Sequence, residues 1–227
     1  MGEVIMLSER REAKRLREPG QRRARTRAEF FFDLACPFTY LAAERVERSF
    51  DEVVWRPAAT DALRRSIMVE GDLYAASVRR AAEERAAELR LPLVWPEHFP
   101  AAVPVAMRVA SHAVECGRGA AFVLAATRLA FCGGFDLDDP EILAEAAAAA
   151  GVVLDGTLLA ASDAGRDGAI EGTGRSLLAA GADRLPALRL AHALYWGEGR
   201  VGEALVAARV AASPRAREIR ARPGSAR

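Results

Sequence analysis

Residues 30–42 read FFFDLACPFTYLA, and this stretch decides which fold the chain can adopt. Three consecutive aromatic residues predict a short buried strand, and Pro37 suits the first position of a helix, where no backbone N–H is needed. Cys36 is therefore expected at or beside the start of that helix. Unpaired amides and the positive end of the helix dipole stabilise a thiolate there, so we predict that the pKa of Cys36 is lowered.

Two interpretations of Cys36 fit this stretch equally well. An ordinary half-buried cysteine at a turn would need no chemical role. A strand that leads into a Cys-Pro pair at the start of a helix is also typical of the reactive corner of a thioredoxin-like fold. Evidence from the rest of the sequence is needed to choose between these two interpretations.

The composition limits the possible classes of protein. A chain of 227 residues, 51% of them hydrophobic, suits one domain with a sizeable core. The net charge of +1 gives no general reason to expect nucleic-acid binding. No run approaches the roughly 18 apolar residues of a membrane span, and we expect no signal peptide. The three cysteines form no Cys-x-x-Cys pair, which favours a reducing, cytoplasmic location.

Both ends of the sequence are rich in arginine. Residues 1–28 are predicted to be a basic, disordered extension, with a nucleic-acid-binding arm as the alternative. Residues 213–227 are predicted to be a second disordered basic tail. We therefore expect no nucleic-acid partner, and we expect the folded part to begin near Glu29.

The order of the predicted elements indicates the fold class. A strand over 29–34, a helix over 37–50 and a strand over 51–57 form a β-α-β unit. A proline-rich loop is expected over 91–104, because its four prolines exclude one regular helix. The other expected elements are helices over 61–69, 74–90, 105–116, 118–131, 140–150, 158–163 and 168–180, strands over 185–190 and 193–196, and a last helix over 201–210.

This order predicts an α/β protein with a thioredoxin-like fold, in which a β-α-β unit and a later β-β-α unit share one sheet. The thioredoxin-like domain would consist of residues 29–57 and 184–212. A large all-helical insertion domain, residues 58–183, would separate its two parts.

The stretch around Cys36 resembles the opening motif of the DsbA-like thioredoxin superfamily. It is closest to the branch that holds 2-hydroxychromene-2-carboxylate isomerases and kappa-class glutathione transferases. Further similar segments follow in the same order and extend the resemblance over about residues 29–210. These segments are residues 54–57 (VWRP), 98–100 (HFP), 136–143 (DLDDPEIL), 185–188 (LPAL) and 195–200 (YWGEGR).

The sequence departs from this family at chemically important positions. Cys36 stands where the isomerases and kappa transferases place a serine, and where DsbA proteins place their nucleophilic cysteine. Thr39 stands where DsbA proteins carry a second, resolving cysteine. Gly199 replaces an aspartate that helps to bind glutathione, and residues 101–103 lack the usual asparagine. The motif is thus a monothiol Cys-Pro-Phe-Thr, and mycothiol becomes an alternative to glutathione.

The resemblance implies roles for several residues. Cys36 would be the nucleophile, or would replace the serine that holds a bound thiol, and Thr39 could donate a hydrogen bond to its sulfur. A cis peptide bond before Pro186 would place the backbone of Leu185 beside Cys36. The candidate catalytic residues are Cys36 and Thr39, and the candidate thiol- or substrate-binding residues are Pro37, Phe38, Leu185, Pro186, Trp196 and Arg200.

Other candidates have plain structural interpretations. Trp196, Tyr195 and Trp55 would line an aromatic pocket or, as the favoured interpretation, pack in the core. Arg200 would hold a carboxylate or lie on the surface. Cys116 and Cys132 are expected to be buried and inert, with a disulfide between them as the alternative. We predict no metal, because His98, His112 and His192 do not have the spacing of metal ligands.

These expectations define a DsbA-like thiol-dependent oxidoreductase that acts through Cys36 with a small thiol, glutathione or mycothiol, as cofactor. Two alternatives stay open. One is a thiol-dependent isomerase or transferase of the 2-hydroxychromene-2-carboxylate isomerase type, and the other is a degenerate member that binds a ligand without turnover. Dimerisation is common in the resembling families, so we expect a homodimer.

Overall fold

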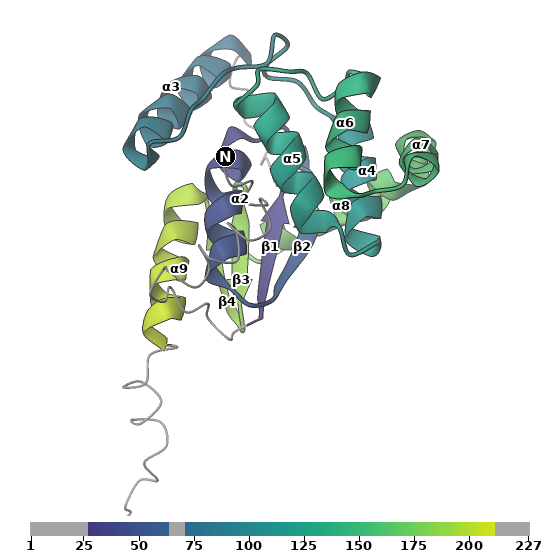
Figure 1. The fold of residues 1–227 in the computed structure, drawn as a ribbon. Coiled ribbons are helices and arrows are strands. Elements are labelled where there is room, and N and C mark those ends of the chain that lie inside the picture. Colours follow the sequence, from purple (N-terminus) through teal and green to yellow (C-terminus); the bar gives the residue numbers. More distant parts are fainter. Residues whose placement is uncertain (1–26, 64–70, 212–227) are drawn as a thin grey trace, which may run out of the picture.

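The computed structural model describes residues 27–63 and 71–211 (Figure 1). Most of the predicted basic extension over 1–28 and all of the tail over 213–227 lie outside these ranges. The predicted helix over 61–69 falls largely outside them as well. Its first three residues form a short 3-10 helix, η1 (Asp61–Leu63).

A four-stranded mixed sheet with the order β2-β1-β3-β4 forms the centre of the structure (Figure 1). Strand β1 pairs with β2 in parallel and with β3 in antiparallel orientation, and β3 pairs with β4 in antiparallel orientation. This α/β arrangement confirms the predicted thioredoxin-like fold. The strands are β1 (Ala28–Phe32), β2 (Val53–Pro57), β3 (Ala187–Leu190) and β4 (Ala193–Trp196).

Three strands, β1, β2 and β3, are shorter than predicted, and for β1 and β3 the reason is local. Strand β1 ends at Phe32 because the Asp33 carboxylate accepts the N–H of Ala35 at 2.9 Å, which turns the chain away from the sheet. Strand β3 starts at Ala187 rather than at Leu185. Pro186 has no N–H to donate to the ladder, so the regular pairing begins only after it.

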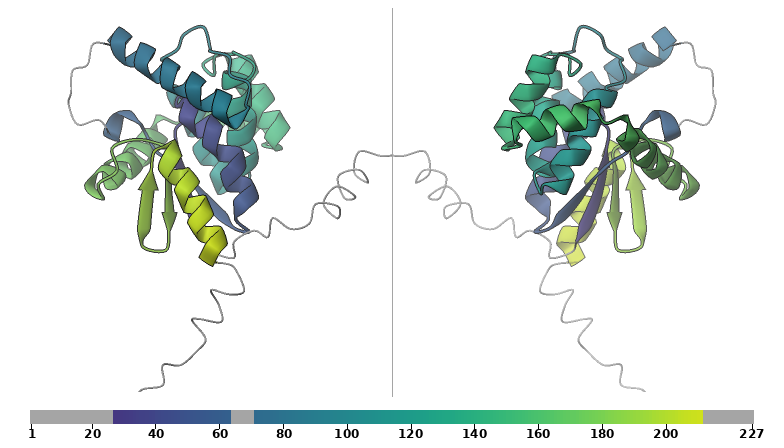
Figure 2. Two further views of the ribbon diagram at one scale, coloured as in Figure 1. Left: turned by 90° about the vertical axis from the view of Figure 1, so that its left-hand side faces the viewer. Right: turned by 90° about the vertical axis from the view of Figure 1, so that its right-hand side faces the viewer.

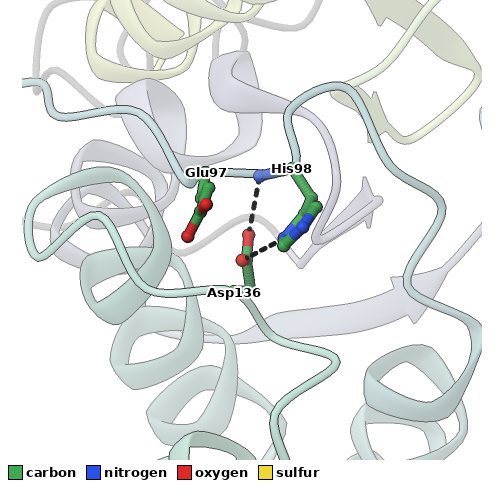
Figure 3. Close-up of side chains that lie close together, drawn as sticks. All are labelled: Glu97, His98 and Asp136. Atoms are coloured by element: carbon green, nitrogen blue, oxygen red, sulfur yellow. Dashed lines mark hydrogen bonds and ion pairs between the residues drawn. The ribbon is translucent and has the colours of Figure 1, made fainter.

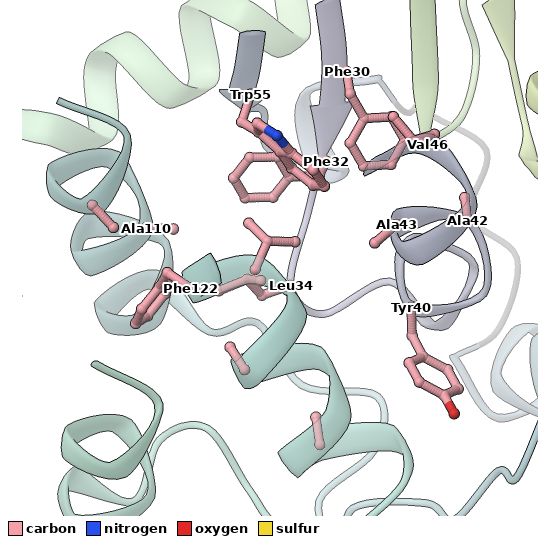
Figure 4. Close-up of a cluster of buried hydrophobic side chains, with 14 of the residues drawn as sticks. Phe30, Phe32, Leu34, Tyr40, Ala42, Ala43, Val46, Trp55, Ala110 and Phe122 are labelled. Carbon is pink, nitrogen blue, oxygen red and sulfur yellow. The ribbon is translucent and has the colours of Figure 1, made fainter. Parts of the chain in front are cut away.

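The alternation of the aromatic residues in β1 divides the core between the two faces of the sheet. Phe30 and Phe32 pack in one cluster with residues of α2 (Pro37–Ser49) and α9 (Glu198–Ala211), and both side chains are fully buried (Figure 4). The two helices cover the same face of the sheet (Figure 2). Phe31 points to the opposite face, where it packs with Leu177 of α8 (Asp167–Ala179).

The described part of the segment between β2 and β3 is mainly helical, as predicted, and the loops over residues 90–103 and 132–139 are among those that connect its helices. The start at Asp139 is confirmed, because its carboxylate accepts the N–H of Glu141 at 2.8 Å. Gly151 ends that helix with φ 72°, a left-handed conformation that glycine adopts readily. The remaining elements are α3 (Gly71–Leu89), α4 (Pro104–Glu115), α5 (Gly119–Phe131), α6 (Pro140–Ala150), α7 (Leu154–Ser162) and η2 (Ala164–Arg166).

The main hydrophobic core continues from the sheet into these helices (Figure 4). Leu34, just beyond β1, is fully buried, and its N–H points at the sulfur of Met107 in α4 at 3.3 Å. Phe122 of α5 belongs to the same cluster. The end of β1 is therefore covered by the helical segment. In the described ranges, none of the helices has the length and apolarity needed to cross a membrane.

A buried carboxylate joins three helices beside the sheet. Glu198, at the start of α9, is 6% exposed and pairs with Arg45 of α2 and with Arg85 of α3. Burial, together with the neighbouring charge of Arg85, lowers the pKa of Arg45 to about 10. These contacts attach α3 to the thioredoxin-like part of the molecule.

The Phe32→Ala variant tests the importance of the core at the end of β1. Removing this fully buried ring leaves a cavity, so we expect a loss of about 3–5 kcal/mol in the free energy of unfolding, measured in urea. Leu159→Ala is the matched control, because Leu159 of α7 is 72% exposed, and it should change stability by less than about 0.5 kcal/mol. Equal effects of the two changes would contradict this assignment of the core.

Candidate functional site

Cys36 is the last residue before α2 and Pro37 is its first residue, as the sequence predicted. The Cys36 backbone is extended, with φ −92° and ψ 115°, so the chain enters the helix directly after the turn. The residue is half-buried, and its thiol is free. The sulfur thus lies where the turn after β1 meets the N-terminus of α2.

The Cys36 thiol contacts a segment that lies far away in the sequence. Its Sγ is 3.6 Å from the carbonyl oxygen of Leu185, to which the S–H donates. The peptide bond between Leu185 and Pro186 is cis, as expected. The predicted neighbourhood of Cys36, Leu185 and Pro186 is therefore present, and both Leu185 and Pro186 are buried.

Thr39 lies one turn into α2 and is fully buried. Its Oγ1 accepts the backbone N–H of Asp33 at 3.4 Å, which connects the helix to the end of β1. The backbone amides of Phe38 and Thr39 and the Thr39 hydroxyl also donate toward the Cys36 sulfur, and each of these bonds favours a lower pKa of the thiol. The position of Thr39 fits the hydrogen-bonding role that the sequence suggested.

Asp33 is a buried carboxylate at this site that the sequence analysis did not single out. Its carboxylate oxygens accept the N–H groups of Ala35 at 2.9 Å and of Thr60 at 2.8 Å, and its carbonyl accepts the N–H of Cys36 at 3.1 Å. Burial raises the pKa of Asp33, and these hydrogen bonds oppose the rise. The sequence did contain a signal for this residue, because Asp33 is an acidic residue that directly follows a predicted buried strand and precedes Cys36 by three positions.

The predicted lowering of the Cys36 pKa is wrong. Burial raises the pKa of the thiol to about 11, and the negative charge of Asp33 contributes to the rise. The hydrogen bonds from Thr39 and Phe38 act in the expected direction but do not outweigh these two effects. At neutral pH the thiol is therefore protonated, and its S–H donates to the Leu185 carbonyl.

The other predicted binding residues differ in how deeply they are buried. Pro37 is buried, and Phe38 is half-buried and packs against the main core. Trp196 is half-buried against the cluster that contains Leu185, whereas Arg200 is exposed and pairs with Glu203 at 3.4 Å. Arg200 thus agrees with its surface interpretation.

The structure distinguishes between the interpretations that the sequence left open for Trp55 and for the other two cysteines. Trp55 is a core residue that contacts Phe30 and Phe32 edge-on, with ring centres at 5.0 and 6.0 Å. Cys116 and Cys132 were predicted to be buried, which is wrong: both are exposed and free, so they form no disulfide. They lie at the C-terminal caps of α4 and α5, beyond the apolar faces of these helices.

A pocket opens beside the turn that carries Cys36. Its cavity volume is only about 30 Å³, and it is partly open to solvent. Leu34 and Ala35 form the wall nearest to the cysteine. The other lining residues are Pro96, His98, Phe99, Ala101, Val103, Ala130, Phe131, Asp136 and Leu137.

Two of the polar groups at this pocket form a pair (Figure 3). His98 Nδ1 lies 2.6 Å from a carboxylate oxygen of Asp136, and the His98 backbone N–H donates to the other oxygen at 3.2 Å. Glu97 lies beside them. The sequence analysis compared only the three histidines with one another. It missed this group because Asp136 follows His98 by 38 residues.

Comparisons with known proteins agree with this architecture. A four-stranded sheet of this topology, with a cysteine at the start of α2 facing a cis proline, defines a protein of the thioredoxin-fold class. A family model described as DSBA-like thioredoxin domain matches residues 27–171, which is more than half of the chain. The chain therefore belongs to the DsbA-like thioredoxin domain family. No curated protein matches the sequence closely enough to count as a relative.

Solved structures share the fold over most of their length. A 2-hydroxychromene-2-carboxylate isomerase has a TM-score of 0.68 with 17% identity, covering 80% of this chain and 93% of its own. The cytosolic disulfide reductase DsbM from Pseudomonas aeruginosa has a TM-score of 0.62 with 14% identity and coverages of 86% and 98%. A probable DsbA oxidoreductase from Streptomyces coelicolor has a TM-score of 0.58 with 22% identity and coverages of 83% and 92%. At these identities the likeness concerns the fold alone.

The Asp33→Asn variant tests what raises the Cys36 pKa. Removing the negative charge should lower this pKa, so Cys36 should react with iodoacetamide at neutral pH roughly threefold to tenfold faster, as expected for a shift of half to one pKa unit. The rate is measured by mass spectrometry of the peptide that contains Cys36, because Cys116 and Cys132 are also exposed.

Asp61→Asn is the matched control for this experiment. Asp61 is an exposed acid near Asp33 and should leave the Cys36 rate unchanged. In Asp33→Asn the new amide group places a donor where an acceptor was, so a loss of about 1–3 kcal/mol in stability is expected, and the labelling is done where the variant is folded. An unchanged or slower rate in folded Asp33→Asn would show that the carboxylate does not raise the pKa.

Proposed function

We propose that the protein is a small-thiol-dependent enzyme in which Cys36 donates a hydrogen bond to the sulfur of a bound thiol. The observation that supports this proposal is the 3.6 Å contact in which the Cys36 S–H donates to the Leu185 carbonyl, at a position where burial raises the pKa of the thiol to about 11. A group that keeps its proton is a poor resting nucleophile, but it is a suitable donor to a thiolate.

In this function the attacking atom is the sulfur of the small thiol. The thiol loses its proton to solvent, and its thiolate takes a hydrogen bond from the Cys36 S–H, which turns to it from the Leu185 carbonyl, while the Thr39 hydroxyl and the first amides of α2 stay bonded to the Cys36 sulfur. It then forms a carbon–sulfur bond to an electrophilic substrate. In a transfer reaction a leaving group departs with the electron pair of its bond to carbon. In an isomerisation the carbon–sulfur bond breaks again and returns the thiolate.

The neighbouring pocket is too small to enclose a substrate, but its apolar wall supports a substrate with an apolar part that packs against it. Its walls near Cys36 are Leu34 and Ala35, and the rings of Phe99 and Phe131 lie across it. Such a lining removes apolar surface of a ligand from water. The thiol itself is glutathione or mycothiol, and Gly199, in place of the family's aspartate, supports testing both.

Disulfide exchange through Cys36 is the second candidate, and it is the function first predicted from the sequence. It is favoured by the hydrogen bonds that the Thr39 hydroxyl and the helix amides direct at the sulfur, and by the disulfide reductase among the fold's neighbours. Deprotonated Cys36 would attack a disulfide, forming a mixed disulfide and releasing one thiolate. A second small thiol would then release Cys36, because Thr39 offers no sulfur.

Replacement of Cys36 by serine and by alanine separates the two functions. With glutathione or mycothiol and 2-hydroxychromene-2-carboxylate as probe, Cys36→Ser should keep turnover within about tenfold of the wild type, since a hydroxyl is also a donor. Cys36→Ala should lose roughly 100- to 1,000-fold, as is typical when a donor to a developing or bound anion is removed.

A small-molecule disulfide serves as the second probe in the same experiment. If the wild type reduces it and both variants lose that activity, while the isomerase probe is not turned over, disulfide exchange is the function. If the wild type acts on neither probe with either thiol, the proposed thiol-dependent activity is contradicted.

A further inference from the structure

We propose that Glu97, His98 and Asp136 form a binding site for a divalent transition-metal ion, such as Zn²⁺, at the edge of the pocket beside Cys36. The three side chains come from two loops, residues 90–103 and 132–139, that the fold brings together (Figure 3). This site is independent of the proposed thiol chemistry, because none of its residues contacts the Cys36 sulfur in the described part of the chain.

The donor atoms are close enough to share one ion. One ligand atom from each of the three residues lies within 4.8 Å of the other two. Around a tetrahedral zinc ion such atoms are roughly 3–3.5 Å apart, given metal–ligand bonds of about 2.0–2.2 Å. The His98 side chain is 73% exposed and Glu97 is exposed, so both can rotate by the small amount needed without disturbing the core.

The loop that carries two of the ligands is held in place from three sides. Arg79 of α3 donates to the Phe99 carbonyl at 2.9 Å and stacks over the ring of Phe99. The Tyr40 hydroxyl donates to the carbonyl of Pro92 at 2.8 Å, and the N–H of Val94 donates to the carbonyl of Phe131 at 2.9 Å. A preorganised backbone reduces the entropy that ligand binding would otherwise cost.

The charge around His98 provides a second, separate indication of a cation. The sequence contains 32 lysine and arginine residues, and acids elsewhere in the described part of the chain, such as Glu44 and Glu115, pair with an arginine. In the ranges that the structure describes, no arginine or lysine forms an ion pair with Glu97, Asp136 or Asp138. The negative charges of Glu97 and Asp138 instead act on His98. His98 is therefore the basic group that faces these acids in the described ranges, and the excess of negative charge at this corner attracts a cation.

The ligand types favour a particular class of ion. One imidazole nitrogen and two carboxylates suit Zn²⁺ and its first-row neighbours better than Ca²⁺, which prefers six to eight oxygen ligands. Three protein ligands leave at least one coordination position for water or for a ligand. Because His98 and Asp136 line the pocket, a molecule bound there would be able to reach this open position.

The prediction of no metal was based on the histidine spacings alone. His98 does not need a second histidine as co-ligand, because the α5–α6 loop supplies Asp136 and the preceding residue supplies Glu97. Glu97 and His98 are adjacent, and Asp136 is remote in the sequence, so no standard spacing of metal ligands describes this group.

Titration with Co²⁺ and Zn²⁺ tests the site on the full chain without a histidine tag. We expect one ion per chain, measured by calorimetry, and cobalt d–d absorption without a thiolate charge-transfer band. His98→Ala should weaken binding at least about tenfold, and Glu97→Gln should weaken it too. Both side chains are exposed, so neither variant should unfold, which thermal melting of the metal-free proteins checks.

Two controls make the result specific. His192→Ala removes an exposed histidine from the turn between β3 and β4 and should bind the ions like the wild type. Cys36→Ser should also bind them normally, which separates this site from the proposed enzyme activity. The absence of binding, a thiolate charge-transfer band, or equal affinity of His98→Ala and the wild type would overturn the proposal.

Discussion

The contact between the Cys36 sulfur and the Leu185 carbonyl depends on the pairing of β1 with β3. In that antiparallel pair Phe31 lies opposite Ala187. The C-terminal end of β1 and the N-terminal end of β3 therefore lie side by side at the same end of the sheet. The turn with Cys36 extends from one strand, and Leu185 and Pro186 extend from the other. Residues 149 positions apart thus become neighbours through strand register alone.

The chemical state of Cys36 results from two opposing effects. The start of α2 offers amides and a threonine hydroxyl that stabilise a thiolate, whereas burial and the charge of Asp33 stabilise the thiol. The second pair of effects is larger, and the pKa rises to about 11. The site therefore combines a protonated sulfur with several other donors. This state of Cys36 is the basis of our proposal that Cys36 acts as a hydrogen-bond donor rather than as the attacking atom.

Much of the fold could be predicted because its signals are local. The aromatic run of β1, Pro37 at the start of α2, and the Asp139-Pro140 cap each act within a few residues. The closeness of Pro186 to Cys36 could be predicted only through resemblance to a family, because no local pattern connects the two segments.

The features that sequence analysis missed depend on tertiary packing. The helix-start argument ignored how strongly Cys36 is desolvated and how near the Asp33 carboxylate lies. The apolar surroundings of Cys116 and Cys132 suggested burial, but each residue follows the last turn of its helix, where the apolar face has ended. His98 and Asp136 meet only because two loops fold against each other over the same pocket.

The most direct test of this account is an ultraviolet titration of the Cys36 thiolate, taken as the difference between the wild type and Cys36→Ser over the alkaline range in which both remain folded. We predict that the thiolate signal is absent at neutral pH and develops toward pH 11. A midpoint below the ordinary cysteine value of about 8.5 would contradict the account, because Cys36 would then be a thiolate rather than a hydrogen-bond donor.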